Sequence, residues 1–262
     1  MSEEEVDEQD LLRYLATLNG RHIAVNTMRQ YLSGILWHLR MRGLELSAEG
    51  NVDRLLKGAS NLRADEVGPA AIRPFWTASD IMRAIAALRA DQSKTWLAGV
   101  ISAFLFASRS ATLDEVRLDH FARRECTLVF HEHCRKTRDA RAIRQMEAPI
   151  DRCVAAAALA EHVEWRRQQG HGGDQALAPG GLQSAVATAV NELQVDSKLL
   201  QTHACRRGAA VSMHALRVEP RTILGWGAWA SERSLRPYVA QQICRQPTPA
   251  DEQIFGWLVG RP

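Results

Sequence analysis

The sequence predicts a mainly α-helical protein with one small β-sheet, an α+β arrangement. The helices follow from apolar side chains that recur at helical spacing and from an unbroken apolar run between Trp96 and Ala107. The sheet follows from a change of period, because residues 126–133 are rich in strand formers and residues 141–150 alternate as a return strand. The apolar run is too short to cross a bilayer, so we expect a buried helix there and no membrane partner.

Length and cysteine usage narrow the class of protein. A chain of 262 residues is long enough for one large domain or two ordinary ones. Its five cysteines include no Cys-x-x-Cys pair, which is typical of a reducing compartment. The opening MSEEEVDEQD is acidic where a signal peptide would be basic and then apolar. We therefore expect an intracellular protein.

The charge is more basic than the net value of +3 indicates. Six of the 30 acidic residues stand in the first ten positions, which hold no basic residue, so the rest of the chain carries 33 basic against 24 acidic residues, a net charge of +9. Only four of the basic residues are lysines. The planar arginine fork matches phosphate, which favours nucleic-acid binding, but a GC-rich genome also favours arginine. Composition alone leaves both interpretations open.

The N-terminal part predicts an acidic tail over residues 1–10, a helical domain over 11–65 and a linker over 66–77, where Gly68, Pro69 and Pro74 interrupt any helix. The clearest helix runs from Asn26-Thr27 to about Arg42. Its apolar stripe consists of Met28, Tyr31, Leu32, Ile35, Leu36 and Leu39. Arg29, Arg40 and Arg42 lie mainly off this stripe, on a face that either is solvated or contacts DNA.

The remaining residues, 78–262, predict a second domain. A helix capped at Ser79-Asp80 leads to the apolar run, a charged amphipathic stretch over 111–118 and the hairpin. Further helices are predicted over 151–168, 181–194, 204–216, 219–226 and 231–241, and a C-terminal tail helix over about 242–262.

A group of residues near the C-terminus contains the side chains most able to take part in a reaction. His203-Ala-Cys-Arg206 opens a predicted helix, Gly227-Ala-Trp229 follows, and Tyr238 stands nine residues after Trp229. This pattern resembles the C-terminal signature of the tyrosine recombinase (phage integrase) family, in a Cre-like variant with Trp at the second His position. Two upstream family elements appear in order: Arg109 after the apolar run, and Lys136-Thr137 in the hairpin turn. The resemblance covers residues 78–241 closely and the N-terminal part loosely.

The resemblance implies a core-binding domain, a catalytic domain and a role for each residue. Tyr238 would attack a phosphodiester to form a 3′-phosphotyrosyl link, and Arg109 and Arg206 would neutralise the phosphate. Lys136 would protonate the leaving 5′-oxygen, His203 would assist proton transfer, and Trp229 would donate to a phosphate oxygen. No metal or other cofactor is expected. The DNA-binding residues that we expect are Arg29, Arg40, Arg42, Arg135 and Arg138.

The implied partners are double-stranded DNA with paired half-sites and further copies of the chain, as a tetramer in a synaptic complex that proceeds through a Holliday junction. An accessory DNA-bending protein is a further expected partner. The apolar tail contains Ile254, Phe255, Trp257 and Leu258 and could fold back onto its own domain. The resemblance favours docking on a neighbouring protomer, which we expect.

One departure from the family pattern keeps other functions open. The family has an acid three residues after its first arginine, and this chain has Thr112 there. This favours, as an alternative, a catalytically weak or inactive DNA-binding accessory protein. A DNA-relaxing enzyme of the type IB topoisomerase kind would share the chemistry. A helical interaction protein without a DNA role would show no salt-dependent DNA affinity.

Overall fold

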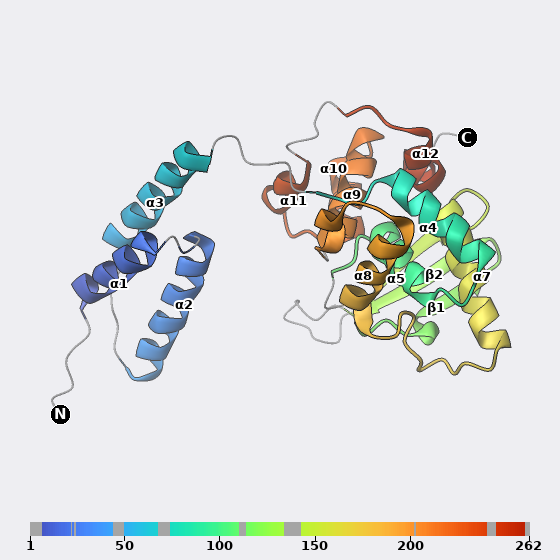
Figure 1. Cartoon of the computed structure of the whole chain (residues 1–262), viewed down its shortest axis with the longest axis horizontal. Helices are drawn as coiled ribbons and strands as arrows, with labels where there is room; N and C mark the ends of the chain where they lie inside the picture. The colour runs from blue at the N-terminus through green and yellow to red at the C-terminus, as the bar shows by residue number, and fades with distance from the viewer. Residues whose placement is uncertain are drawn as a thin grey trace. The chain divides into compact units, whose positions relative to one another are not determined.

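The computed structural model describes residues 7–21, 23, 25–43, 50–67, 74–109, 114–133, 143–201, 203–239 and 245–259. The chain divides into two compact units, an N-terminal unit of residues 1–72 and a C-terminal unit of residues 73–262 (Figure 1). The sequence-based prediction of a mainly helical protein with a small sheet is confirmed. Across the described residues, no helix combines the length and the apolar character needed to span a bilayer.

Within its described residues, the N-terminal unit has three helices: α1 (Glu8–Gly20), α2 (Val25–Met41) and α3 (Asn51–Val67). Asp7 caps α1 in a reciprocal capping box with Asp10. The predicted acidic tail is therefore wrong at its C-terminal end, because acids are favourable in the first turn of a helix. The buried apolar cluster of this unit consists of Leu11, Leu15, Leu18, Met28, Val52 and Leu56.

The predicted helix of residues 26–42 is confirmed as α2, and Gly43 follows its end with a φ of +76°. Tyr31 was wrongly placed in the apolar stripe, since its side chain is 47% exposed. It lies beyond the edge of the face that packs on α1 and α3. The predicted linker also begins too early, because α3 continues to Val67. Residues 64–67 have ordinary helix propensities, and the first strong helix breakers are Gly68 and Pro69.

The C-terminal unit opens with α4 (Ala78–Ala90) and α5 (Thr95–Leu105). The N-cap of α4 is Thr77, with Asp80 at the third helical position, so the prediction of a Ser79-Asp80 cap was wrong by two residues. The apolar run is confirmed as a buried helix, in which every residue from Leu97 to Leu105 is buried. In Figure 1, α5 lies among α4, α7 (Val154–Gln168), α8 (Gly181–Leu193) and α9 (His203–Ala215).

The sheet has three antiparallel strands in the order β1 (Phe121–Arg124), β2 (Thr127–His133) and β3 (Ile143–Pro149). The predicted hairpin is confirmed as β2 and β3, whereas β1, which is four residues long and half arginine, was missed. The short 3-10 helix η1 (Leu118–His120) precedes β1. The predicted amphipathic stretch of 111–118 is wrong over its described residues, 114–118, which form a turn, an isolated bridge from Arg117 to Ala176 and the start of η1.

The later helices agree with the predicted ones except in the tail, where a helix over about 242–262 was predicted and residues 245–248 are not helical. They are α7, α8 and α9, together with α10 (Pro220–Gly227), α11 (Glu232–Val239), α12 (Pro249–Phe255) and the 3-10 helices η2 (Ser197–Leu200) and η4 (Gly256–Val259). The C-terminal tail packs on its own unit, which is one of the two arrangements considered for it, and its docking on a neighbouring protomer stays a prediction. Ile254 and Phe255 are fully buried in the core of their own unit, and the Phe255 ring lies 5.6 Å from that of Phe104. The ion pair of Arg245 with Asp251, at 2.8 Å, holds α12 in place.

Candidate active site

Arg206 lies on α9 with its charged side chain only 2% exposed. Helix α9 packs on α5, and Arg206 donates a hydrogen bond to the carbonyl of Ala107, just after the end of α5. A charge can be buried at moderate cost when hydrogen bonds satisfy it. The close packing of α9 depends on Gly208, where a Cβ atom would come within 1.9 Å of the Trp76 carbonyl oxygen.

Arg109 is half-buried and reaches the end of α10 from the other side of the core. Its Nη2 donates to the carbonyl of Ala228 at 2.9 Å. Both accepting alanines have positive φ angles, +46° at Ala107 and +50° at Ala228. A non-glycine residue in the left-handed region carries backbone strain, which recurs at functional sites. Neither of these hydrogen bonds neutralises a guanidinium, because a carbonyl has no net charge.

Trp229 joins the arginines to the predicted nucleophile. The Arg206 guanidinium carbon lies 4.0 Å from the centre of the Trp229 ring, a cation–π contact. The Tyr238 ring meets the Trp229 ring edge to face, with 5.5 Å between the ring centroids. Gly227 makes room for this arrangement, since a Cβ atom there would come within 1.7 Å of the Trp229 ring. Arg109, Arg206, Trp229 and Tyr238 therefore form one group, which we call the Arg–Trp–Tyr cluster.

The indole nitrogen of Trp229 is a buried donor for which the described residues supply no hydrogen-bond acceptor. A buried polar group without a partner is rare in folded proteins and costs free energy of about 1–3 kcal/mol. In a group that also contains two arginines, an anion with hydrogen-bond-accepting oxygens is the partner that would satisfy it.

Electrostatics also favour an anion in the cluster. Burial and the nearby charge of Arg109 lower the pKa of Arg206 to about 10, against the opposing effects of Tyr238 and Glu132. The lowered pKa reflects first the burial of the Arg206 guanidinium and second its nearness to another positive charge, that of Arg109. A bound phosphate would compensate both charges and would raise the pKa of Arg206 again.

Of the other two predicted catalytic residues, the structure describes His203 and does not describe Lys136. His203 is exposed at the first position of α9, one turn before Arg206, so the two side chains leave the helix on the same side. Lys136, Arg135, Arg138 and Thr112 lie outside the described residues. Their roles stay predictions.

The sequence analysis missed a buried ion pair beside the cluster. Glu132 on β2 accepts from Arg144, its register partner on β3. Arg144 in turn donates from Nη1 to the carbonyls of Gly225 at 2.9 Å and Trp226 at 2.8 Å, at the C-terminal end of α10. Strand alternation was the signal that could have found Glu132, because Leu128 and Phe130 share its face and are buried.

Arg207 was also missed. Its side chain is buried, donates to the carbonyl of Pro74, and lies with its guanidinium carbon 5.9 Å from the centre of the Tyr238 ring. Nothing in the sequence separates Arg207 from the many other arginines. It is recognisable only once α11 is packed on α9.

Comparison with solved structures assigns the fold. The XerH site-specific recombinase in a post-cleavage complex with palindromic difH substrate aligns with a TM-score of 0.63 at 14% identity, over 92% of this chain and 70% of that one. This chain has the tyrosine-recombinase fold. XerA recombinase aligns with a TM-score of 0.51 at 13% identity, over 100% of this chain and 86% of that one. A lambda integrase dimer bound to a COC' core site gives 0.53 at 12% identity, over 91% and 81%.

Sequence comparison does not reach this relationship. No family model matches the chain, and no curated protein matches it. At identities of 12–14% the recombinase fold is preserved in the packing of the core while most side chains differ. The structural likeness therefore supports the fold-class prediction.

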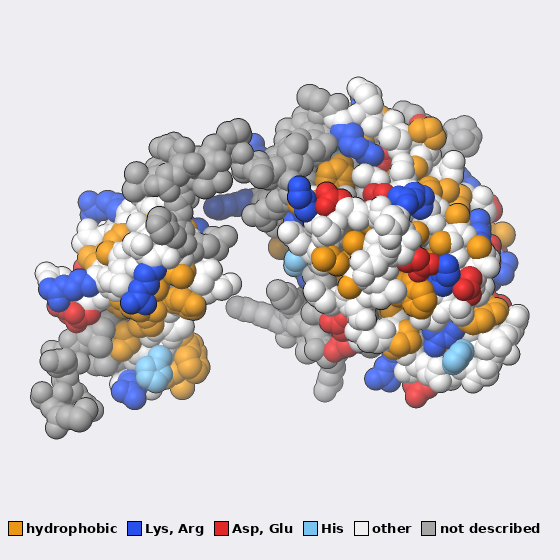
Figure 2. Space-filling view, viewed as in Figure 1, with side chains coloured by type: hydrophobic (Ala, Val, Ile, Leu, Met, Phe, Trp, Pro, Cys, Tyr) orange, Lys and Arg blue, Asp and Glu red, His pale blue; other side chains and the backbone are white. Residues whose placement is uncertain are grey.

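The predicted DNA-binding arginines of the N-terminal unit are all exposed, on or just after α2. Arg29 and Arg40 are three helical turns apart and share a face, whereas Arg42 points to a different side of the helix axis. On the face shown in Figure 2, basic and acidic side chains are interspersed over the C-terminal unit and do not form one basic patch. Charge on the visible surface is therefore a weaker indication of the function than the buried cluster.

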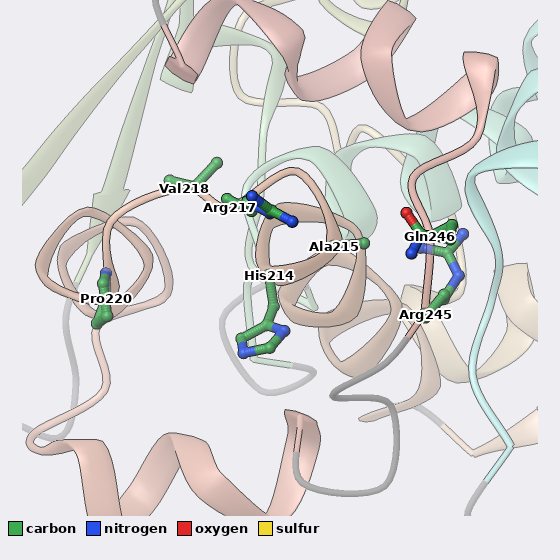
Figure 3. Close-up of a pocket in the computed structure, with 7 residues that line it drawn as sticks. All are labelled: His214, Ala215, Arg217, Val218, Pro220, Arg245 and Gln246. Atoms are coloured by element: carbon green, nitrogen blue, oxygen red, sulfur yellow. The ribbon is translucent and has the colours of Figure 1, made fainter.

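A cavity of about 400 Å³ lies at the opposite end of α9 from His203 and Arg206. Figure 3 shows His214 between Pro220 on one side and Arg245 and Gln246 on the other. None of the residues of the Arg–Trp–Tyr cluster lines it. This cavity is therefore separate from the candidate site of the recombinase fold.

Proposed function

We propose that this chain is a site-specific DNA recombinase that cleaves and rejoins DNA strands through a 3′-phosphotyrosyl link to Tyr238. The observation that carries the proposal is the convergence of Arg109, Arg206, Trp229 and Tyr238 in a unit with the tyrosine-recombinase fold. The double-stranded DNA partner is supported by the solved complexes with similar folds, which hold DNA.

The chemistry assigns one task to each group. The Tyr238 oxygen attacks the phosphorus, the bond to the 5′-oxygen breaks, and Lys136 supplies the proton to that oxygen. His203 takes part in moving the tyrosine proton. The reverse reaction with a 5′-hydroxyl of another strand rejoins the DNA, so no metal or energy-rich cofactor is needed. This requires paired half-sites and several copies of the chain, which is the reason to propose a synaptic tetramer.

The transition state concentrates negative charge on the non-bridging phosphate oxygens. Arg109 and Arg206 are held by neutral carbonyls, so their charges remain available to those oxygens. The indole N–H of Trp229 adds a donor that needs no reorganisation, because the ring of Tyr238 and the guanidinium of Arg206 already orient the indole. Pre-oriented donors in a buried site stabilise developing charge far better than donors in water.

A covalent trap tests this proposal. Nicked duplexes from DNA flanking the gene are incubated with the full chain, and covalent adducts are separated on a denaturing gel. We expect an adduct with the unmodified protein, none with Tyr238→Phe, and a normal adduct with the control Tyr31→Phe, which changes an exposed tyrosine of the N-terminal unit. An adduct that persists in Tyr238→Phe would show that another residue is the nucleophile.

A second function, a DNA-binding accessory protein without cleavage, is favoured by one observation, Thr112 in place of the family's acid. It predicts salt-dependent binding to the same duplexes without any adduct from the unmodified protein. The gel and a parallel binding titration therefore separate the two functions.

A further inference from the structure

Glu132 and Arg144 form an ion pair beside the candidate site, and a contribution to stability alone is a weak reason for its presence there. Glu132 is 5% exposed, and its carboxylate accepts from Arg144. Replacing a buried ion pair by apolar residues is often neutral or stabilising, so the presence of such a pair is weak support for a purely structural role. Its contacts indicate what else it does.

Arg144 fixes the end of α10. Its Nη1 donates to the carbonyls of Gly225 and Trp226, two of the last carbonyls of the helix, which have no partner within it. A cation at this end also interacts favourably with the helix dipole. The Trp226 indole donates to the carbonyl of Leu105 at 2.7 Å, so the end of α10 is tied both to β3 and to the end of α5.

The residues that follow this fixed end belong to the candidate site. Ala228 presents the carbonyl that accepts from Arg109, and Trp229 places its ring against Arg206. The chain therefore runs directly from the carbonyls that Arg144 holds to two contacts of the Arg–Trp–Tyr cluster. A small shift at Gly225 and Trp226 would move both contacts at once.

Glu132 also supplies negative charge to a strongly positive group. Arg109 and Arg206 are held by neutral carbonyls, and Arg144 is a third guanidinium near them. The Glu132 carboxylate keeps the pKa of Arg206 higher than burial and Arg109 alone would. In the family, such a charge comes from an acid three residues after the first arginine. This chain has the neutral residue Thr112 at that position.

We propose that Glu132, through its ion pair with Arg144, is the positioning carboxylate of the Arg–Trp–Tyr cluster. This inference rests on the proposed strand-cleaving function. Glu132 does not touch the phosphate. It keeps Arg109, Arg206 and Trp229 in the arrangement that binds the phosphate oxygens.

Single-turnover cleavage of the nicked duplexes by the full chain tests the inference, with the maximal rate and the half-saturating DNA concentration measured separately. We expect Glu132→Gln to lower the maximal rate about 100-fold, as small misplacements of catalytic groups do, with the half-saturating concentration changed less than threefold. The matched control is Glu147→Gln, an exposed glutamate of β3, which should cleave normally.

A double variant, Glu132→Leu with Arg144→Met, removes both charges and leaves no unpaired one, so it stays folded if Glu132→Gln alone does not. We expect it to melt as the unmodified protein does and to cleave at least tenfold more slowly. Normal cleavage by the double variant, or by Glu132→Gln, would overturn the inference while leaving the proposed function intact. An unmodified protein that binds the duplexes and forms no adduct would overturn the proposed function and this inference with it.

Discussion

The two units of the molecule differ in where their arginine side chains lie. The N-terminal unit keeps Arg29, Arg40 and Arg42 on its surface, together with apolar side chains such as Trp37 and Met41, which are 63% and 70% exposed. The C-terminal unit buries Arg206 and Arg207 deep in its structure. Only the larger unit has a core extensive enough to surround a guanidinium with carbonyls and rings, because the buried fraction of a domain rises with its size.

On the proposed function, the exposed arginines would bind the DNA backbone and the buried ones would act on the phosphate that is cleaved. Exposed arginines on long side chains adapt to a phosphate backbone and contribute affinity that salt weakens. Buried arginines held by Ala107 and Ala228 cannot adapt, and this rigidity is what stabilisation of a transition state requires. Four predictions test whether the two units differ in this way.

The largest effect is expected for a buried charge of the C-terminal unit. Arg206→Gln should lower the rate of adduct formation by about 10²–10³-fold, because it removes a fixed donor to the phosphate oxygens. Arg236→Gln, an exposed arginine on α11 two residues before Tyr238, is the matched control and should stay within about threefold of the unmodified rate. Equal effects of the two substitutions would mean that burial is irrelevant to the role of Arg206.

The next effect concerns packing. Gly227→Ala forces a Cβ atom to within 1.7 Å of the Trp229 ring and should lower the free energy of unfolding by about 3 kcal/mol, together with cleavage. Gly225→Ala lies two residues earlier on α10, and its Cβ would meet nothing within 4 Å. It should be neutral or stabilising by up to about 1 kcal/mol. Denaturant unfolding measures both variants, and a Gly227→Ala protein as stable as the unmodified one would contradict the packing at Trp229.

A buried histidine makes the C-terminal unit sensitive to acid. Burial, with a smaller contribution from Arg166, lowers the pKa of His162 to about 4 from an ordinary value of 6.5. The unfolded chain binds this proton more readily, so stability is complete above pH 6.5 and is lost as the pH falls towards 4. We expect a loss of about 2 kcal/mol between pH 7 and pH 5 from this residue. In His162→Gln this part of the pH dependence of thermal unfolding should disappear, and an unchanged slope would exclude His162 as its source.

The smallest effect is expected on the N-terminal unit. Replacing Arg29 and Arg40 by Gln should reduce the slope of log affinity against log salt by about 2, because each phosphate contact contributes about 0.9. The maximal cleavage rate should not change. Arg13→Gln, on α1 beside Asp10, is the control with an unaltered slope. A changed maximal rate would show that the N-terminal unit affects the cleavage step and not only the affinity for DNA.

Local signals in the sequence account for most of the elements. The period of the apolar residues locates α2 and α5, and the change of period locates β2 and β3. Errors arose where the energy differences are small. The cap of α4 was predicted at Ser79 and lies at Thr77. Both residue types can cap a helix, but only Thr77 forms the capping box with Asp80.

The sequence by itself determined which residue types stand at the candidate site and in what order, since the spacing of His203, Arg206, Trp229 and Tyr238 is a property of the chain. It is the packing of the core that brings Arg109 to the carbonyl of Ala228 at the end of α10, lets Glu132 and Arg144 hold that end, and places the tail on its own unit. The physical reason is distance along the chain. Helix and strand periods act over a few residues, whereas the hydrogen bonds of Arg109 to Ala228 and of Arg206 to Ala107 join residues about a hundred positions apart, which only the packing of the core brings together.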